Sequence, residues 1–139
     1  MTSVLPDNPG RRPSGAIARA GYGAVVNLAL PSSDNAIDNE GSLVTGLGMS
    51  YVHLPVDFEA PMAEDARRFI GVMRALTGQR VFVHCAMNLR VSAFMYHFLK
   101  HERGLSDSAA RSPVLARWEP RMTDVWRGFL ELPADEVLP

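Results

Sequence analysis

A chain of 139 residues with 47% apolar content can fill one hydrophobic core, whereas each of two domains would have too few apolar residues for a core of its own. The formal net charge of -1 excludes an overall basic field for nucleic acids or acidic membranes, so any anion must be recognised locally. The single cysteine excludes an internal disulfide and a cysteine-rich zinc site, and it is typical of a reducing compartment.

The first 13 residues are predicted to form an irregular lead-in to one domain that spans 1–139. Three prolines, a glycine and two adjacent arginines lie between Pro6 and Pro13. Arg11 and Arg12 could contact an acidic partner, but a solvated lead-in is the simpler interpretation. We expect a soluble, cytoplasmic protein without nucleic-acid or membrane partners, because the sequence has neither a leader pattern nor a run of about 18 apolar residues.

The first half of the chain alternates predicted helices and strands. A helix is predicted over Ser14–Gly21 and a strand over Ala24–Leu28. A polar loop over Pro31–Asn39 leads to a helix over Glu40–Leu47, which Gly48 ends. The next strand is predicted over Ser50–Leu54.

The second half continues the alternation and ends in helices. The loop PVDFEAP precedes a predicted amphipathic helix over Ala63–Leu76. The run Arg80–His84 is a strand that is apolar on both faces, as in the middle of a parallel sheet. A helix is predicted over Val91–Arg103, and two more over Ser106–Leu132, interrupted near its prolines. This order predicts an α/β fold, a parallel sheet flanked by helices.

Ligands of such sheets bind beyond the carboxyl ends of the strands, which here are Asn27-Leu28, PVDFEAP and His84-Cys85. A cysteine at a strand end is more often a buried small hydrophobe than a nucleophile. Five residues lead from this cysteine into a helix: Ala86, Met87, Asn88, Leu89 and Arg90. The amides of such a turn, the helix dipole and a guanidinium stabilise a thiolate and bind an oxyanion. The pattern therefore predicts attack on a phosphate ester.

Displacing an alcohol from phosphorus also needs an acid for the leaving oxygen, and Asp57 in PVDFEAP is the first candidate, with Glu59 second. Either could equally be a solvated loop carboxylate. His84 faces away from Cys85 because neighbours on a strand point to opposite sides. We interpret His84 as orienting the loop through hydrogen bonds, the alternative being a buried polar residue satisfied by backbone.

The run VFVHCAMNLRVSAFMYHFL resembles the signature of the protein tyrosine and dual-specificity phosphatase superfamily: His-Cys, five residues, Arg, then Ser or Thr at a helix start. More closely, the chain resembles a group of small bacterial phosphatase-like proteins with VVNLALP, GMSYVHLPVDFEAP, VFVHCAMNLRVSAF and a late WEP in this order. The resemblance covers about Ala20–Leu132. It implies a parallel sheet of about four strands flanked by helices, and no metal or cofactor.

The resemblance also implies roles for individual residues. Cys85 would form a phosphocysteine, and Asp57 would protonate the leaving group and then activate water. Ser92 matches the hydroxyl that helps the thiolate leave. The backbone from Ala86 to Arg90 would wrap the phosphate, with His84 and Asn27 as supporting residues.

The departure from the superfamily pattern lies at the arginine, which stands five places after the cysteine, with Val91 in the usual place. One residue at a helix start is about 100° of rotation, so Arg90 needs a reshaped loop to contact phosphate bidentately. Asn88 replaces the usual glycine and tolerates left-handed backbone.

Three functions stay open. The first is a hydrolase of phosphate monoesters, either phosphotyrosine and phosphoserine in proteins or small phosphoesters. The second is a non-catalytic module that binds an anion or a partner protein, which the displaced arginine favours if Arg90 points to solvent or a carboxylate. The third is a rhodanese-like sulfurtransferase, which needs no acid loop. Trp118 and Trp126 are interpreted as packing the last helices onto the sheet rather than stacking on a ligand.

Overall fold

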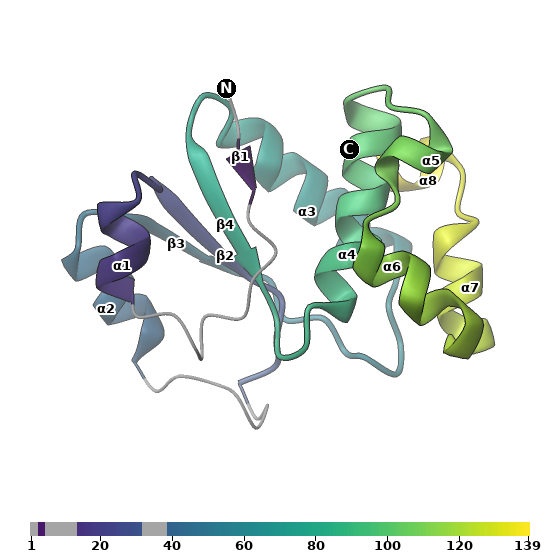
Figure 1. Cartoon of the computed structure of the whole chain (residues 1–139), viewed down its shortest axis with the longest axis horizontal. Coiled ribbons are helices and arrows are strands. Elements are labelled where there is room, and N and C mark those ends of the chain that lie inside the picture. The colour runs from purple at the N-terminus through teal and green to yellow at the C-terminus, as the bar shows by residue number, and fades with distance from the viewer. Residues whose placement is uncertain (1–2, 5–13, 32–38) are drawn as a thin grey trace. The chain divides into compact units, whose positions relative to one another are not determined.

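The computed structural model describes residues 3–4, 14–31 and 39–139. The chain divides into two compact units, the first formed by 1–55 with 76–88 and the second by 56–75 with 89–139. The first unit holds the sheet and the second consists of helices and loops (Figure 1). The single domain predicted over 1–139 stays a prediction.

The sheet of the first unit has four parallel strands in the order β1-β4-β2-β3. Their bounds are β1 (Ser3–Val4), β2 (Ala24–Asn27), β3 (Ser50–His53) and β4 (Arg80–His84). This confirms the predicted α/β fold with a small parallel sheet. β4 lies between β1 and β2, as its apolar character on both faces indicated.

The strand β1 is a correction to the irregular lead-in predicted over 1–13. Ser3 pairs with Arg80 and Val4 with Val81, so these two positions extend the sheet. The proline pattern on which the prediction rested starts only at Pro6, and Arg11 and Arg12 lie outside the described residues.

Two helices, α1 (Ser14–Arg19) and α2 (Glu40–Gly46), pack on one face of the sheet. Their apolar residues form a cluster with the strands: Ile17, Tyr22, Val25, Val44, Met49 and Phe82. Positive φ angles of 90° at Gly21 and 86° at Gly48 follow the two helices, where the sequence predicted their ends.

The second unit is built around α4 (Leu89–His97), which packs against α3, α5, α6 and α7. The other helical segments are α3 (Ala63–Ala75), the π-helix η2 (Phe98–Glu102), α5 (Asp107–Ala110), α6 (Pro113–Trp118), the 3₁₀ turn η3 (Glu119–Arg121), α7 (Asp124–Leu130) and α8 (Ala134–Val137). The prediction of two helices over Ser106–Leu132 is therefore wrong. Ser106 and Ser112 each cap a new helix, accepting from the amides of Ala109 and Leu115.

Aromatic rings fill the interior of the second unit. Phe94 of α4 contacts Phe69, with ring centroids 5.7 Å apart, and Phe129, with centroids 4.9 Å apart. His97 is fully buried beside Phe129, and its Nε2 donates to the Phe129 carbonyl at 2.7 Å. Its Nδ1 is buried and has no hydrogen-bond partner among the described residues. Burial lowers the pKa of His97 to about 4.

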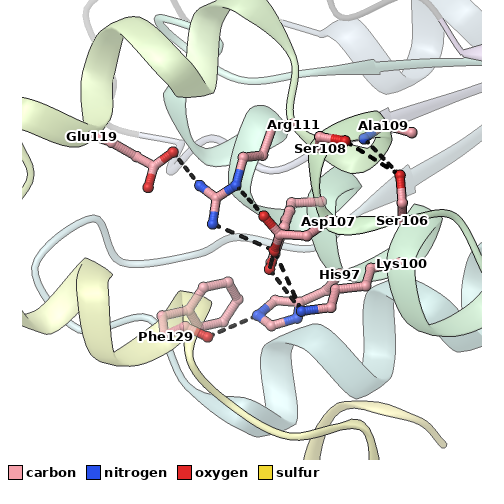
Figure 2. Close-up of polar contacts among 10 residues, drawn as sticks. His97, Lys100, Ser106, Asp107, Ser108, Ala109, Arg111, Glu119 and Phe129 are labelled. Atoms are coloured by element: carbon pink, nitrogen blue, oxygen red, sulfur yellow. Dashed lines mark hydrogen bonds and ion pairs between the residues drawn. The ribbon is translucent and has the colours of Figure 1, made fainter.

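A cluster of charged side chains, here named the surface ion cluster, joins η2, α5 and the end of α6 (Figure 2). Its members are Lys100, Asp107, Arg111 and Glu119. Asp107 Oδ2 accepts from Arg111 Nε at 2.8 Å, and its Oδ1 accepts from the Tyr96 hydroxyl at 2.5 Å. Arg111 also pairs with Glu119. These donors hold the pKa of Asp107 below its usual range, and the cluster lines a cavity of about 490 Å³.

Candidate active site

The site in the first unit begins where β4 ends. Cys85 follows His84 directly and is 1% exposed. His84 lies beside Asn27 in the sheet register, and Asn27 lies beside His53 on its other side. Side chains in lateral register share a face, so Asn27 and His84 lie on the face that α1 and α2 cover, and Cys85 alternates to the other side.

A buried polar network, here named the Glu40 network, occupies that face. Glu40 Oε2 accepts from His84 Nε2 at 2.7 Å. Glu40 Oε1 accepts from the Tyr51 hydroxyl at 3.0 Å and from Asn27 Nδ2 at 3.2 Å. The Nε2 of His84 is therefore paired with a carboxylate. Burial, with the charge and hydrogen bond of Glu40, raises the pKa of Tyr51 to about 12, so the phenol stays a donor.

The loop that follows Cys85 has a left-handed residue where the superfamily pattern has glycine. Asn88 has a φ of 64°, as its tolerance of this region predicted. Met87 at the tip of the loop is 72% exposed. The helix α4 starts at the next residue, Leu89, so the loop is a strand-to-helix turn as predicted.

The second unit holds the other predicted site residues. Ser92 is buried, and its hydroxyl donates to the Leu89 carbonyl at 2.6 Å, within the first turn of α4. In this arrangement the one hydrogen of Ser92 Oγ is used by the Leu89 carbonyl, and a rotation of the hydroxyl would free it for another acceptor.

Arg90 is 7% exposed and points neither to solvent nor to a carboxylate. Its Nη1 donates to the Val56 carbonyl at 2.9 Å, and its guanidinium lies 5.6 Å from the centre of the Phe58 ring. Both contacts are to the loop that carries Asp57. Arg90 therefore anchors the predicted acid loop.

The loop around Asp57 is also held from its other side. Trp126 Nε1 donates to the Phe58 carbonyl at 2.8 Å, and the Phe58 ring stacks on Trp118 with centroids 5.8 Å apart. Both tryptophans are buried. Asp57 is exposed, and its Oδ1 accepts from the amide of Glu59 at 2.9 Å. This turn orients the Asp57 carboxylate, whereas Glu59 contributes its backbone.

Each unit thus brings some predicted residues together. In the first, Asn27 and His84 meet through Glu40; in the second, Arg90 contacts the loop of Asp57. Glu40, Tyr51 and the Trp126 bond were not predicted from the sequence as parts of the site. Lateral register would have placed Asn27 beside His84, but the contacts of Glu40 and Trp126 are long-range and leave no local pattern.

In the described ranges, no group of three or more His, Cys, Asp or Glu side chains is placed to hold a metal ion. In the same ranges, no helix is both long and apolar enough to span a membrane.

Comparison with solved structures found close likenesses. One is a phosphatase candidate of the DUF442 family from Shewanella putrefaciens CN-32, with 31% identity, a TM-score of 0.80, and coverage of 99% of this chain and 87% of that one. The active form of Tk-PTP has 24% identity, a TM-score of 0.69, and coverage of 96% and 90%. Pseudomonas aeruginosa TpbA in complex with phosphotyrosine has 12% identity, a TM-score of 0.69, and coverage of 97% and 83%.

The last two likenesses show the fold, and the first, with its higher identity, shows the family. No protein-family model matches the chain, and no curated protein does. The fold is that of the protein tyrosine phosphatases.

Proposed function

The chain belongs to the DUF442 family of phosphatase-like proteins, and we propose that it hydrolyses phosphate monoesters through a phosphocysteine on Cys85. The observation that carries the proposal is the strand-to-helix turn after Cys85, with its left-handed Asn88. Such a turn directs successive amides at one point, where they and the start of α4 bind a phosphate group.

In the first step the Cys85 thiolate attacks phosphorus, and the bond from phosphorus to the ester oxygen breaks. Asp57 gives its proton to that leaving oxygen. In the second step Asp57, now a carboxylate, takes a proton from a water molecule that attacks phosphorus. The sulfur–phosphorus bond breaks, and the Ser92 hydroxyl rotates away from the Leu89 carbonyl to donate its hydrogen to the departing thiolate. Inorganic phosphate then leaves.

Arg90 has a double role in this proposal. One N–H of Nη1 donates to the Val56 carbonyl, and the other N–H groups of the guanidinium are available to donate to phosphate oxygens. Because Val56 precedes Asp57, the same side chain that binds phosphate would also hold the acid loop. The contact with the loop of Asp57 supports a catalytic role for Arg90.

The shifted arginine also supports the second candidate, an anion-binding module with little or no turnover. The superfamily arginine stands one place later, and Arg90 is committed in part to the Val56 carbonyl. A module of this kind would bind phosphate or a phosphorylated partner with Cys85 still in place.

The test is hydrolysis of an aryl phosphate from pH 5 to 8, an ester chosen because TpbA of this fold binds phosphotyrosine. Wild-type activity that is lost in Cys85→Ser supports the phosphocysteine. Asp57→Asn should lower kcat about a hundredfold or more. The same change at its neighbour, Glu59→Gln, decides between the two acids. A wild type that hydrolyses nothing but binds phosphate would favour the module.

A further inference from the structure

The Glu40 network lies directly before the proposed nucleophile and has no part in the steps above. Glu40, His84 and Asn27 are each less than a tenth exposed. Asn27 Nδ2 lies 3.0 Å from the Tyr51 hydroxyl, so the amide and the phenol contact each other as well as Glu40. Burying polar groups is costly unless each is hydrogen-bonded, and even a satisfied network often stabilises a fold no more than apolar packing would. Its presence beside Cys85 therefore points to a functional role.

The network fixes the backbone at the carboxyl ends of three strands. The His84 carbonyl accepts from the Leu28 amide at 2.8 Å, and Asn27 Oδ1 accepts from the Ala29 amide at 2.9 Å. The Asn27 carbonyl accepts from the Leu54 amide at 2.9 Å. Glu40 bonds to a side chain from each of these three strands, including His84 at the end of β4, which Cys85 follows.

Glu40 is the hydrogen-bond acceptor of this network. Asn27, Tyr51 and His84 all donate to its carboxyl oxygens, and three donors suit the ionised form of the group. The titratable groups that face His84 are Glu40 from α2 and Tyr51 from β3, with the His53 ring 6.2 Å beyond Tyr51.

We propose that Glu40 is a positioning residue that acts on Cys85 through His84. It holds the imidazole, and with it the backbone at the end of β4, from which Cys85 and the amides of the following turn extend. Amides that converge on the sulfur favour the thiolate. This inference rests on the proposed function, since it explains how the thiol becomes a nucleophile.

The test reads the ionisation of Cys85 directly, by the ultraviolet absorbance of its thiolate between pH 4 and 9. Cys85 is the one cysteine of the 139 residues, so Cys85→Ser supplies the blank. The variants are Glu40→Gln, His84→Gln and the double variant. Glu64→Gln is the matched control, because Glu64 lies on the surface and pairs with Arg68. Circular dichroism establishes that each variant is folded.

Glu40→Gln should lower the fraction of thiolate at pH 5 about threefold to tenfold, while Glu64→Gln leaves it unchanged. The double variant should match His84→Gln alone, because Glu40 acts through His84. Wild-type ionisation in folded Glu40→Gln, or additive effects in the double variant, would overturn the proposal. If Glu40→Gln does not fold, Tyr51→Phe decides: about twofold less thiolate supports the proposal and wild-type ionisation refutes it.

The measurement needs no substrate. A wild type that hydrolyses no ester would therefore count against the proposed function alone, and the thiolate titration would still decide the role of Glu40.

Discussion

The Glu40 network of the first unit and the surface ion cluster of the second both join carboxylates to donors at similar distances, but they differ in burial. The side chains of Glu40 and His84 are 6% and 5% exposed, whereas Asp107 is 51% and Lys100 36% exposed. Water solvates the partners of an exposed pair that is broken, but it does not reach those of a buried pair. Similar geometry should therefore have very different consequences.

The largest effect is expected from Glu40→Ala. The substitution leaves His84, Asn27 and Tyr51 without their shared acceptor inside the first unit. Breaking a buried pair in this way costs about 3 to 5 kcal/mol of unfolding free energy. Urea denaturation at pH 7 measures it. A loss as small as that of a surface variant would show that the network is dispensable for folding.

The next effect is the acid destabilisation caused by His97, which is fully buried in the second unit. Its pKa is about 4 in the folded state and near 6.5 when unfolded, so the unfolded chain takes up the proton first as the pH falls. Stability should fall between pH 6.5 and 4, by up to about 3 kcal/mol from this residue.

His97→Gln is the comparison for that prediction, since it keeps a donor for the Phe129 carbonyl and does not titrate. Urea midpoints measured at several pH values should converge for the two proteins as the pH is lowered. Parallel curves would mean that another group causes the acid loss.

An intermediate effect is expected at the partly buried bond between Trp126 and the Phe58 carbonyl. Trp126→Phe keeps an aromatic ring but removes the donor, which costs about 1 kcal/mol. Trp118→Phe is the control, because Trp118 contacts Phe58 by stacking. Under the proposed function, kcat should fall more in Trp126→Phe than in Trp118→Phe, with KM unchanged. Equal kcat values would show that this bond does not position the acid loop.

The smallest effect is expected from Asp107→Asn in the surface ion cluster. The substitution removes the charge that faces Arg111 and Lys100, and the melting temperature should change less than in any variant above. The difference from wild type should vanish in 1 M salt, where charges are screened beyond about 3 Å. A large decrease in melting temperature that is the same in 1 M salt would show that the surface ion cluster stabilises the fold as strongly as the Glu40 network does.

The sequence predicted the sheet and its helices because periodicity and turn residues are local signals. Gly21 and Gly48 both have positive φ angles where helices were predicted to end. The C-terminal third was harder, because helices such as α5 are too short to show a period. Ser106 and Ser112, the caps that divide this region, were the signal available there.

Only the part of the candidate site that consists of contiguous residues could be predicted from the sequence. Cys85, its loop and the left-handed Asn88 follow from one short run. The bonds of Glu40 to His84 and of Arg90 to Val56 join residues that are 44 and 34 positions apart. Such contacts depend on strand register and loop path, which a single sequence does not specify.

The pairing of β1 with β4 has a consequence for the behaviour of the chain in solution. Without Ser3 and Val4, β4 would be the edge of the sheet and would present its unpaired amides and carbonyls along an apolar strand. Exposed apolar edges are templates for pairing between molecules and so for aggregation. The backbone of Ser3 and Val4 thus covers the N-terminal half of β4, the strand that leads to Cys85. This pairing protects that part of the strand from self-association.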